Sequence, residues 1–130
     1  MAADQNKDVV RRFITEVLSG GRLDRIDELL APGYVNRAFG ADLPKFKELL
    51  AGLAAVLPER RFDVEEMIAE ADAVVTRFTF EARDVAGNTT TVRGMTYYRL
   101  ADGKIVEDDP ITTPELTHAL GPAMASAAAA

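Results

Sequence analysis

The stretch Ala73-Val-Val-Thr-Arg-Phe-Thr-Phe-Glu-Ala-Arg-Asp84 decides the fold, because its side chains alternate in character with a period of two. Successive side chains of a β-strand point to opposite faces, so the stretch predicts a strand with two unlike faces. The face expected to be buried carries Val74, Thr76, Phe78, Phe80 and Ala82. The other face carries Val75, Arg77, Thr79, Glu81 and Arg83. We therefore expect a sheet that is covered on one side.

The same period of two extends over the rest of the chain after Pro58. Turn residues at Gly87-Asn88 and Asp102-Gly103 divide this region into segments. The predicted strands are Arg61–Ala71, Ala73–Asp84, Thr89–Leu100 and Lys104–Thr112. Their short connections predict antiparallel pairing of neighbours.

Before Pro58 the apolar residues instead recur at helical spacing. Three helices are predicted: Asp4–Leu18, ended by Ser19-Gly20-Gly21; a short helix over residues 23–30, closed by Pro32-Gly33; and a third that starts at an Asp42 N-cap and stops at Pro58. A short extended piece covers residues 34–37, and Pro114 opens a last short helix.

Three helices followed by an antiparallel meander indicate an α+β protein. We expect a curved antiparallel sheet wrapped around the three N-terminal helices. Residues 1–121 are predicted to form a single domain, and the alanine-rich residues 122–130 a flexible tail.

Composition excludes several classes of function. A formal charge of −6 with scattered basic residues argues against nucleic acid as a partner. The sequence contains no cysteine, which excludes disulfides and thiolate nucleophiles, and its ligands suit no metal site. The N-terminus shows no secretory signal, and no apolar run has the length of a membrane span. We expect a soluble, cytoplasmic protein that acts without a cofactor.

Several stretches of the sequence resemble one known family. They are Asn6-Lys-Asp-Val-Val-Arg-Arg-Phe13, Leu23-Asp-Arg-Ile-Asp-Glu-Leu-Leu-Ala-Pro32, Val92-Arg-Gly94 and Ala101-Asp-Gly-Lys-Ile-Val-Glu107. With the order of elements, they resemble the SnoaL-like, polyketide cyclase-like branch of the nuclear transport factor 2-like superfamily. The resemblance implies a cone-shaped fold around an apolar pocket. It leaves the reaction open, since the superfamily includes cyclases, epoxide hydrolases, isomerases, dehydratases and non-catalytic modules.

The resemblance also implies a catalytic carboxylate on the last strand, but the matching position here is Pro110. The Arg and Asp typical of limonene epoxide hydrolase correspond to Phe78 and Phe80. Only the Tyr-x-Asn feature of that enzyme has a counterpart, in Tyr34 and Asn36.

Asp108 is the leading candidate for catalysis. Alternation along a strand predicts that it shares a face with Val106 and Pro110. If that face lines the pocket, desolvation would raise the pKa of the Asp108 carboxyl and suit it to acid–base chemistry. The alternative is an exposed acidic strand end formed with Asp109.

Tyr34 and Asn36 lie two residues apart and therefore face the same way on an extended segment. They are expected to position a substrate oxygen or a water; the alternative is that they bind nearby loop backbone. The predicted substrate pocket is lined by Phe39, Phe78, Phe80, Thr96 and Tyr98. The alternative for the apolar members is plain core.

His118, the only histidine, is expected to be exposed near the end of the last helix, unless that helix folds across the pocket. The outer face of the sheet mixes Met95 and Tyr97 with charged residues, a composition that suits the homodimer interface which the resemblance implies. Two functions stay open: a cofactor-free acid–base enzyme acting on a hydrophobic small molecule, and a non-catalytic binding or dimerisation module.

Overall fold

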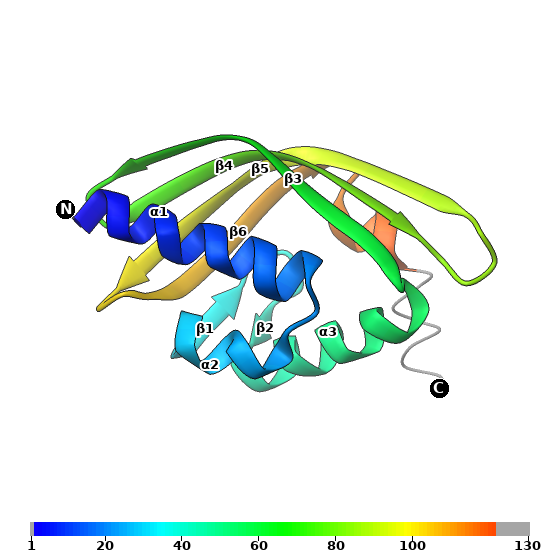
Figure 1. The fold of residues 1–130 in the computed structure, drawn as a ribbon, viewed down its shortest axis with the longest axis horizontal. Coiled ribbons are helices and arrows are strands. Elements are labelled where there is room, and N and C mark those ends of the chain that lie inside the picture. The colour runs from blue at the N-terminus through cyan, green and yellow to red at the C-terminus, as the bar shows by residue number, and fades with distance from the viewer. Residues whose placement is uncertain (1, 122–130) are drawn as a thin grey trace.

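The computed structural model describes residues 2–121, and it shows helices packed on one face of a curved sheet (Figure 1). The helices are α1 (Ala2–Arg12), which continues as a π-helix over Phe13–Ser19, a 3₁₀ turn at Leu23–Arg25, α2 (Ile26–Leu29) and α3 (Leu43–Val56). A last helical segment begins at residue 116.

The sheet contains six strands in the order β2-β1-β6-β5-β4-β3. The strands are β1 (Leu30–Asn36), β2 (Ala41–Asp42), β3 (Glu59–Glu70), β4 (Ala73–Arg83), β5 (Thr89–Ala101) and β6 (Lys104–Thr113). Strands β3 to β6 form the predicted antiparallel meander. The pairing of β1 with β6 is parallel, so the sheet is mixed rather than wholly antiparallel.

The alternation of β4 predicted the burial of its side chains correctly. Val74 and Thr76 are fully buried, and Phe78, Phe80 and Ala82 nearly so, whereas Arg77 on the opposite face is exposed. In Figure 1 the sheet arches over α1, α2 and α3, which cover its concave face. The predicted α+β fold is therefore confirmed.

Helix α3 begins where the sequence indicated. The Asp42 carboxylate accepts a hydrogen bond of 3.0 Å from the Lys45 amide, and Pro44 occupies the first turn. This is the N-cap arrangement in which a side chain binds an amide that has no partner inside the helix.

The second helix is shorter than predicted. It ends at Leu29, and Leu30 already belongs to β1, which runs through Pro32-Gly33. The β1–β6 register shifts between Leu30 and Val35, so the proline lies in an interruption of the pairing. The spacing of apolar residues predicted that Leu30 belongs to the helix. In the structure Leu30 pairs with Ile105 of β6 and therefore belongs to the sheet.

Two apolar clusters fill the space between helices and sheet. The first joins α1 and its π-helical continuation to β1, through residues such as Phe13, Val17 and Tyr34. The second lies under the end of α3 and includes Leu57, Phe78 and Leu120. Phe13 and Val17 are thus core residues, and the space beside both clusters holds the candidate site.

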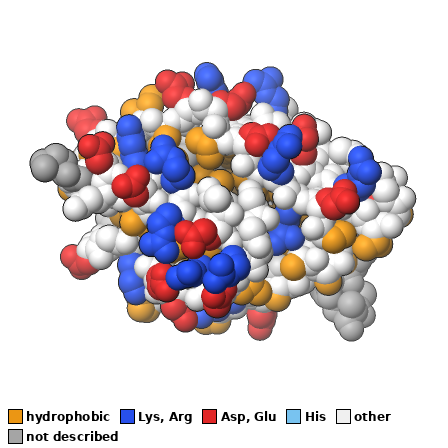
Figure 2. All heavy atoms as spheres, in the orientation of Figure 1, with side chains coloured by type: hydrophobic (Ala, Val, Ile, Leu, Met, Phe, Trp, Pro, Cys, Tyr) orange, Lys and Arg blue, Asp and Glu red, His pale blue; other side chains and the backbone are white. Residues whose placement is uncertain are grey.

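On the face shown in Figure 2, basic side chains lie among acidic ones rather than in a continuous stripe. Within residues 2–121, no helix is long and apolar enough to cross a membrane. The predicted tail, residues 122–130, lies outside the described part of the chain.

Candidate functional site

A β-bulge in β6 changes which residues share a face with Asp108. Arg99 pairs with Glu107 but the next residue, Leu100, pairs with Ile105, so Val106 is an extra residue. A bulge interrupts side-chain alternation, and here it puts Ile105 and Asp108 on the same inner face. The expectation that Asp108 shares its face with Val106 was therefore wrong, although its inward orientation is found: the residue is only 5% exposed.

The parallel pairing of β1 with β6 brings the other two candidates to Asp108. Asn36 is the register partner of Asp108, and the Tyr34 hydroxyl donates a 2.8 Å hydrogen bond to Asp108 Oδ2. Asn36 Nδ2 donates in turn to the Tyr34 hydroxyl at 3.4 Å. Its Oδ1 accepts from the Phe39 amide, so Asn36 also binds loop backbone. The three predicted residues form one buried cluster.

Burial changes the acidity of this cluster. Desolvation raises the pKa of the Asp108 carboxyl to about 7, and the nearby Asp109 charge adds to the rise. The hydrogen bond from Tyr34 acts in the opposite direction because it stabilises the carboxylate. Asp108 can therefore both accept and release a proton near neutral pH.

Tyr98 lies directly across the β5–β6 pairing from Asp108. Burial, and after it the Asp108 charge, raise the pKa of the Tyr98 phenol well above its usual range, while a hydrogen bond with Thr96 opposes this. The pKa of Tyr34 is raised by the same two causes. Both phenols therefore remain neutral hydrogen-bond donors at neutral pH.

A cavity of about 70 Å³ lies between α3 and the concave face of the sheet. It is lined by Leu18, Asn36, Phe39, Phe46, Leu49, Leu50, Leu53, Leu57, Arg60, Phe62, Phe80, Thr96, Tyr98, Asp108 and Leu120. The lining is mostly apolar, with a few polar groups, as is typical of small-molecule sites. Its volume is well below the roughly 300–1,000 Å³ of most ligand pockets, so a drug-sized ligand requires side chains to move.

Four of the five predicted pocket residues line this cavity: Phe39, Phe80, Thr96 and Tyr98. Phe78 lies in the second apolar cluster without lining the cavity, and its ring lies 5.5 Å from that of Phe62. Alternation placed it on the correct face, but position along β4 decides which inward side chains reach the cavity.

The last helix contributes Leu120 to the cavity wall, and His118 lies on its exposed side. Pro110 faces Thr96 across the β5–β6 pairing. The inward-facing carboxylate of this strand is therefore Asp108, two residues before Pro110, the position that the resemblance indicated.

Arg60 is a cavity residue that the sequence did not single out. Its Nε donates to the Leu18 carbonyl at 3.0 Å and its Nη1 to the Leu57 carbonyl at 3.1 Å. An arginine two residues before Phe62, on the same side of a strand that follows a helix-ending proline, was the available signal. The strand was predicted to start at Arg61, which left Arg60 unassigned.

Within residues 2–121, no group of three or more histidine, aspartate or glutamate side chains is arranged to hold a metal ion. The polar groups that converge on the cavity are instead suited to hydrogen bonding and proton transfer.

Solved structures of several proteins share this fold. AclR from Streptomyces galilaeus, a proposed hydroxylase, is 20% identical, with a TM-score of 0.75 over 92% of this chain and 86% of its own. IdmH from Streptomyces antibioticus, a proposed polyketide cyclase, is 21% identical, with a TM-score of 0.74 over 90% of this chain and 99% of its own. TerC, crystallised with polyporic acid, is 21% identical, with a TM-score of 0.72 over 92% of this chain and 98% of its own.

At this level of identity the similarity shows the nuclear transport factor 2-like fold and not the reaction. Among curated protein sequences, none matches this chain significantly. The model of the SnoaL-like domain family matches residues 10–108, which is most of the chain. The chain therefore belongs to the SnoaL-like family.

Proposed function

We propose that this protein is a cofactor-free acid–base enzyme that acts on a hydrophobic small molecule, with Asp108 as the proton-transferring group. The observation that carries the proposal is a carboxyl group with a pKa of about 7 in the wall of an apolar cavity. When the pKa of a base lies near the working pH, a large fraction of the base is deprotonated. It is also still basic enough to remove a proton from the substrate. Cyclisation, isomerisation, dehydration and hydrolysis all use such a group.

The surrounding side chains have distinct roles in this proposal. The Asp108 carboxylate removes a proton from an acidic C–H, a hydroxyl or a water, and the resulting acid returns it to the product. Tyr34 holds the carboxylate through its 2.8 Å hydrogen bond, and Asn36 holds Tyr34. Tyr98 is the donor available to a developing oxyanion, because its phenol is neutral and lines the cavity.

The matching experiment follows hydrogen–deuterium exchange at the α-carbon of 2-tetralone in D₂O by NMR. This exchange requires only a base and an apolar site. We expect Asp108→Asn to lower the enzyme-catalysed rate by about 10²–10⁴, the usual contribution of a general base. We also expect the wild-type rate to rise with pH through about 7.

Asp109→Asn is the control, because it removes a neighbouring carboxylate on the opposite face of β6, across from Tyr97. Because the Asp109 charge contributes to the raised pKa of Asp108, this control is expected to shift the pH profile slightly toward lower pH and to leave the maximal rate nearly unchanged. Equal rates for the wild type and Asp108→Asn would contradict the proposal.

The competing function is a non-catalytic ligand-binding or dimerisation module. Two observations favour it: the usual carboxylate position is Pro110, and the cavity measures only about 70 Å³. A wild-type protein that binds apolar probes but accelerates no exchange would support this function.

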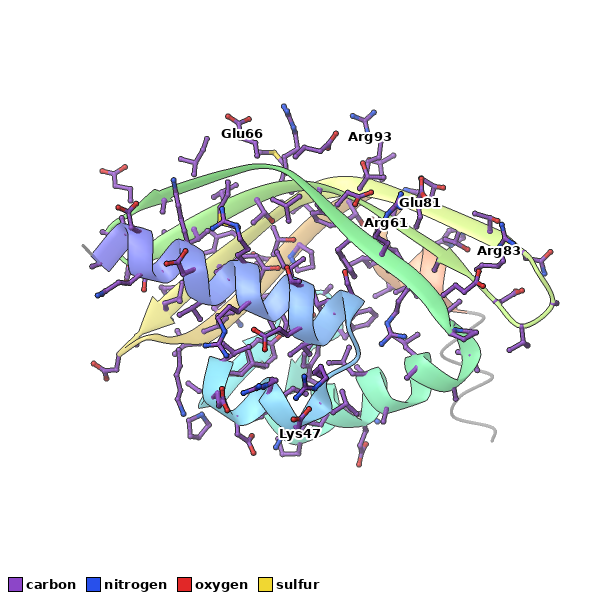
Figure 3. All side chains as sticks on the ribbon, viewed as in Figure 1. Lys47, Arg61, Glu66, Glu81, Arg83 and Arg93 are labelled. Carbon is purple, nitrogen blue, oxygen red and sulfur yellow. The ribbon has the colours of Figure 1, made fainter. Side chains whose placement is uncertain are left out.

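The convex face of the sheet is the proposed homodimer interface. Met95 faces Ile111 across β5 and β6, and two residues along β5, Tyr97 continues the row. Ile111 is 77% exposed and Met95 50%, which is unusual for apolar side chains that lie together. Figure 3 shows Glu66 and Arg93 projecting from the same face, away from the helices. Apolar and aromatic residues flanked by opposite charges suit a self-complementary contact.

A further inference from the structure

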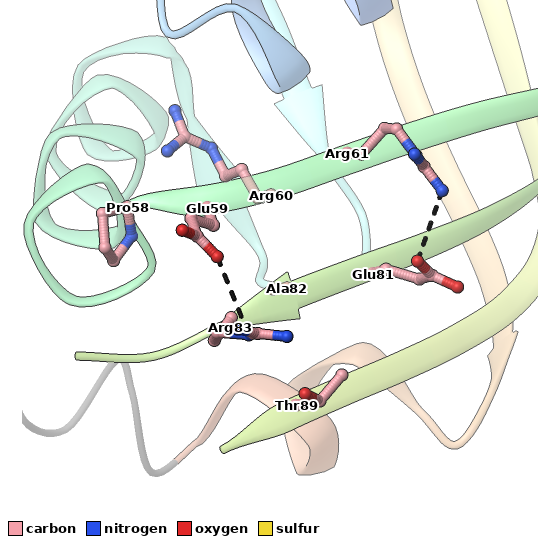
Figure 4. A pocket seen from close by; sticks show the side chains of 8 residues that line it. All are labelled: Pro58, Glu59, Arg60, Arg61, Glu81, Ala82, Arg83 and Thr89. Carbon is pink, nitrogen blue, oxygen red and sulfur yellow. Dashed lines mark hydrogen bonds and ion pairs between the residues drawn. The ribbon is translucent and has the colours of Figure 1, made fainter. Parts of the chain in front are cut away.

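Arg60 is the only basic side chain that lines the cavity within the described residues. The Arg60 side chain points from β3 toward α3 (Figure 4). Its neighbour Glu59 points toward Arg83, and Arg61 points toward Glu81. The guanidinium is half-buried between the end of the π-helix and the end of α3, where it binds the Leu18 and Leu57 carbonyls.

The charge of Arg60 has no carboxylate partner within residues 2–121, in contrast to its neighbours. Arg61 pairs with Glu81 at 3.4 Å and Arg83 with Glu59 at 3.7 Å. A guanidinium has five N–H donors, and the two carbonyls use only Nε and one proton of Nη1. Desolvation also lowers the pKa of Arg60, which means that burial of this cation is not compensated by an anion.

Arg60 and Asp108 both line the cavity, next to residues from opposite ends of α3. The lining residues of α3 and its C-cap run from Phe46 to Leu57, a stretch of roughly 16 Å at 1.5 Å per residue. Phe46 marks the end near Asp108, since its ring lies 5.0 Å from that of Tyr34, the hydrogen-bond partner of Asp108. Leu57 marks the other end, because its carbonyl binds Arg60.

We propose that Arg60 binds the carboxylate of an elongated, otherwise apolar substrate whose opposite end reaches Asp108. The unused donors of the guanidinium suit a carboxylate, which can accept two of them at once. The Asp108 carboxylate repels the same group, so the two charges orient the ligand in one direction. This inference rests on the proposed function for the identity of the reacting end, and it makes Arg60 a specificity-determining residue.

The test compares octanoate with 1-octanol, which share an eight-carbon chain and differ in the carboxylate. We expect wild-type protein to bind octanoate about tenfold more tightly than octanol in calorimetric titrations, as one charge-assisted hydrogen-bond pair provides. We also expect octanoate, and not octanol, to shift the Nε–H NMR resonance of Arg60.

Arg60→Gln is expected to remove the preference for octanoate and leave octanol binding unchanged. Its amide still donates one hydrogen bond, so one of the two carbonyls keeps a partner. Arg60→Lys retains the charge and is expected to keep part of the preference, which separates charge recognition from a loss of folding. Arg61→Gln is the matched control: it removes the same charge one residue away, on the other side of the strand, and is expected to bind as the wild type does.

The proposal is overturned if wild-type protein shows no preference for octanoate, or if Arg60→Gln keeps it. Because these measurements report binding, their failure would leave proton transfer by Asp108 intact. Conversely, an inactive but octanoate-selective protein would refute the acid–base function and keep the carboxylate site.

Discussion

Asp108 shows how strongly a local environment changes a common residue. The residue is 5% exposed, and the single hydrogen bond of its carboxyl group within the described residues comes from Tyr34. One donor does not replace the hydration of a carboxylate, so burial outweighs the hydrogen bond and the pKa rises. The adjacent Asp109 is half-buried on the other face of the same strand.

The raised pKa of Asp108 predicts a specific pH dependence of stability. The carboxyl titrates near 3.8 in the unfolded chain and near 7 in the folded protein. Between these values the folded state holds a proton that the unfolded state has released. Its contribution to the free energy of unfolding is therefore complete below about pH 4 and lost as the pH rises through about 7. The gap of about 3 pH units corresponds to about 4 kcal/mol.

Urea unfolding of wild type and Asp108→Asn between pH 5 and pH 8 measures this contribution. We expect the difference between the two proteins to move in favour of Asp108→Asn by about 3 kcal/mol as the pH rises, because pH 5 lies about 2 units below the folded pKa. Asp109→Asn serves as the reference for a change in charge on the same strand; it keeps the Asp108 carboxyl and is expected to lower its pKa only slightly, since Asp109 is the smallest of the causes. A difference that stays constant with pH would mean that Asp108 titrates as an ordinary carboxylate.

At the level of elements, the β5–β6 pair forms the wall that carries Tyr98 and Asp108. The two strands approach each other closely at Gly94, which is paired with Thr112. A β-carbon at Gly94 would overlap the Ile111 carbonyl oxygen and lie 2.8 Å from Thr112 Cγ2. The absence of a side chain at this position is therefore a requirement of the pairing.

We expect Gly94→Ala to destabilise the protein by about 1–3 kcal/mol, the usual cost of forcing atoms into a packed region. Thermal and urea unfolding measure the effect. Gly33→Ala is the matched control, because Gly33 also lies in a strand but a β-carbon added there would meet no atom within 4 Å. Equal effects of the two substitutions would contradict the close approach at Gly94.

At the scale of the whole molecule, the two faces of the sheet differ in the side chains that they expose. The concave face, together with the helices, encloses the cavity, whereas the convex face exposes Met95, Tyr97 and Ile111. An apolar row of this kind on an otherwise charged surface is typical of an interaction site.

If the convex face forms a homodimer, Ile111→Lys should shift the protein toward monomer in sedimentation velocity experiments. Bringing two lysines into the contact adds repulsion and a desolvation cost to the lost apolar area. Val85→Lys is the control, since Val85 is 79% exposed but lies in the turn between β4 and β5. A dimer that tolerates Ile111→Lys, or a wild-type monomer, would refute this interface.

Local sequence patterns determined much of the fold. The period of two in β4 predicted which side chains are buried, and Asp42 marked the start of α3. Such features depend on residues close in sequence, because a strand face or a helix cap is a property of a few neighbouring side chains. The sequence also pointed to Tyr34, Asn36 and Asp108, through a resemblance and through alternation.

Only the tertiary structure decided how these residues meet. The parallel pairing of β1 with β6 joins Tyr34 to Asp108 across 74 positions of sequence, and the bulge at Val106 places Ile105 on the face of Asp108. The place of Arg60 in the cavity wall likewise depends on where α3 and the π-helix end beside β3. Periodicity carries no information about pairing between distant strands, since many registers satisfy the same alternation. The packing of the whole chain selects one of them, and with it the surroundings that set the acidity of Asp108.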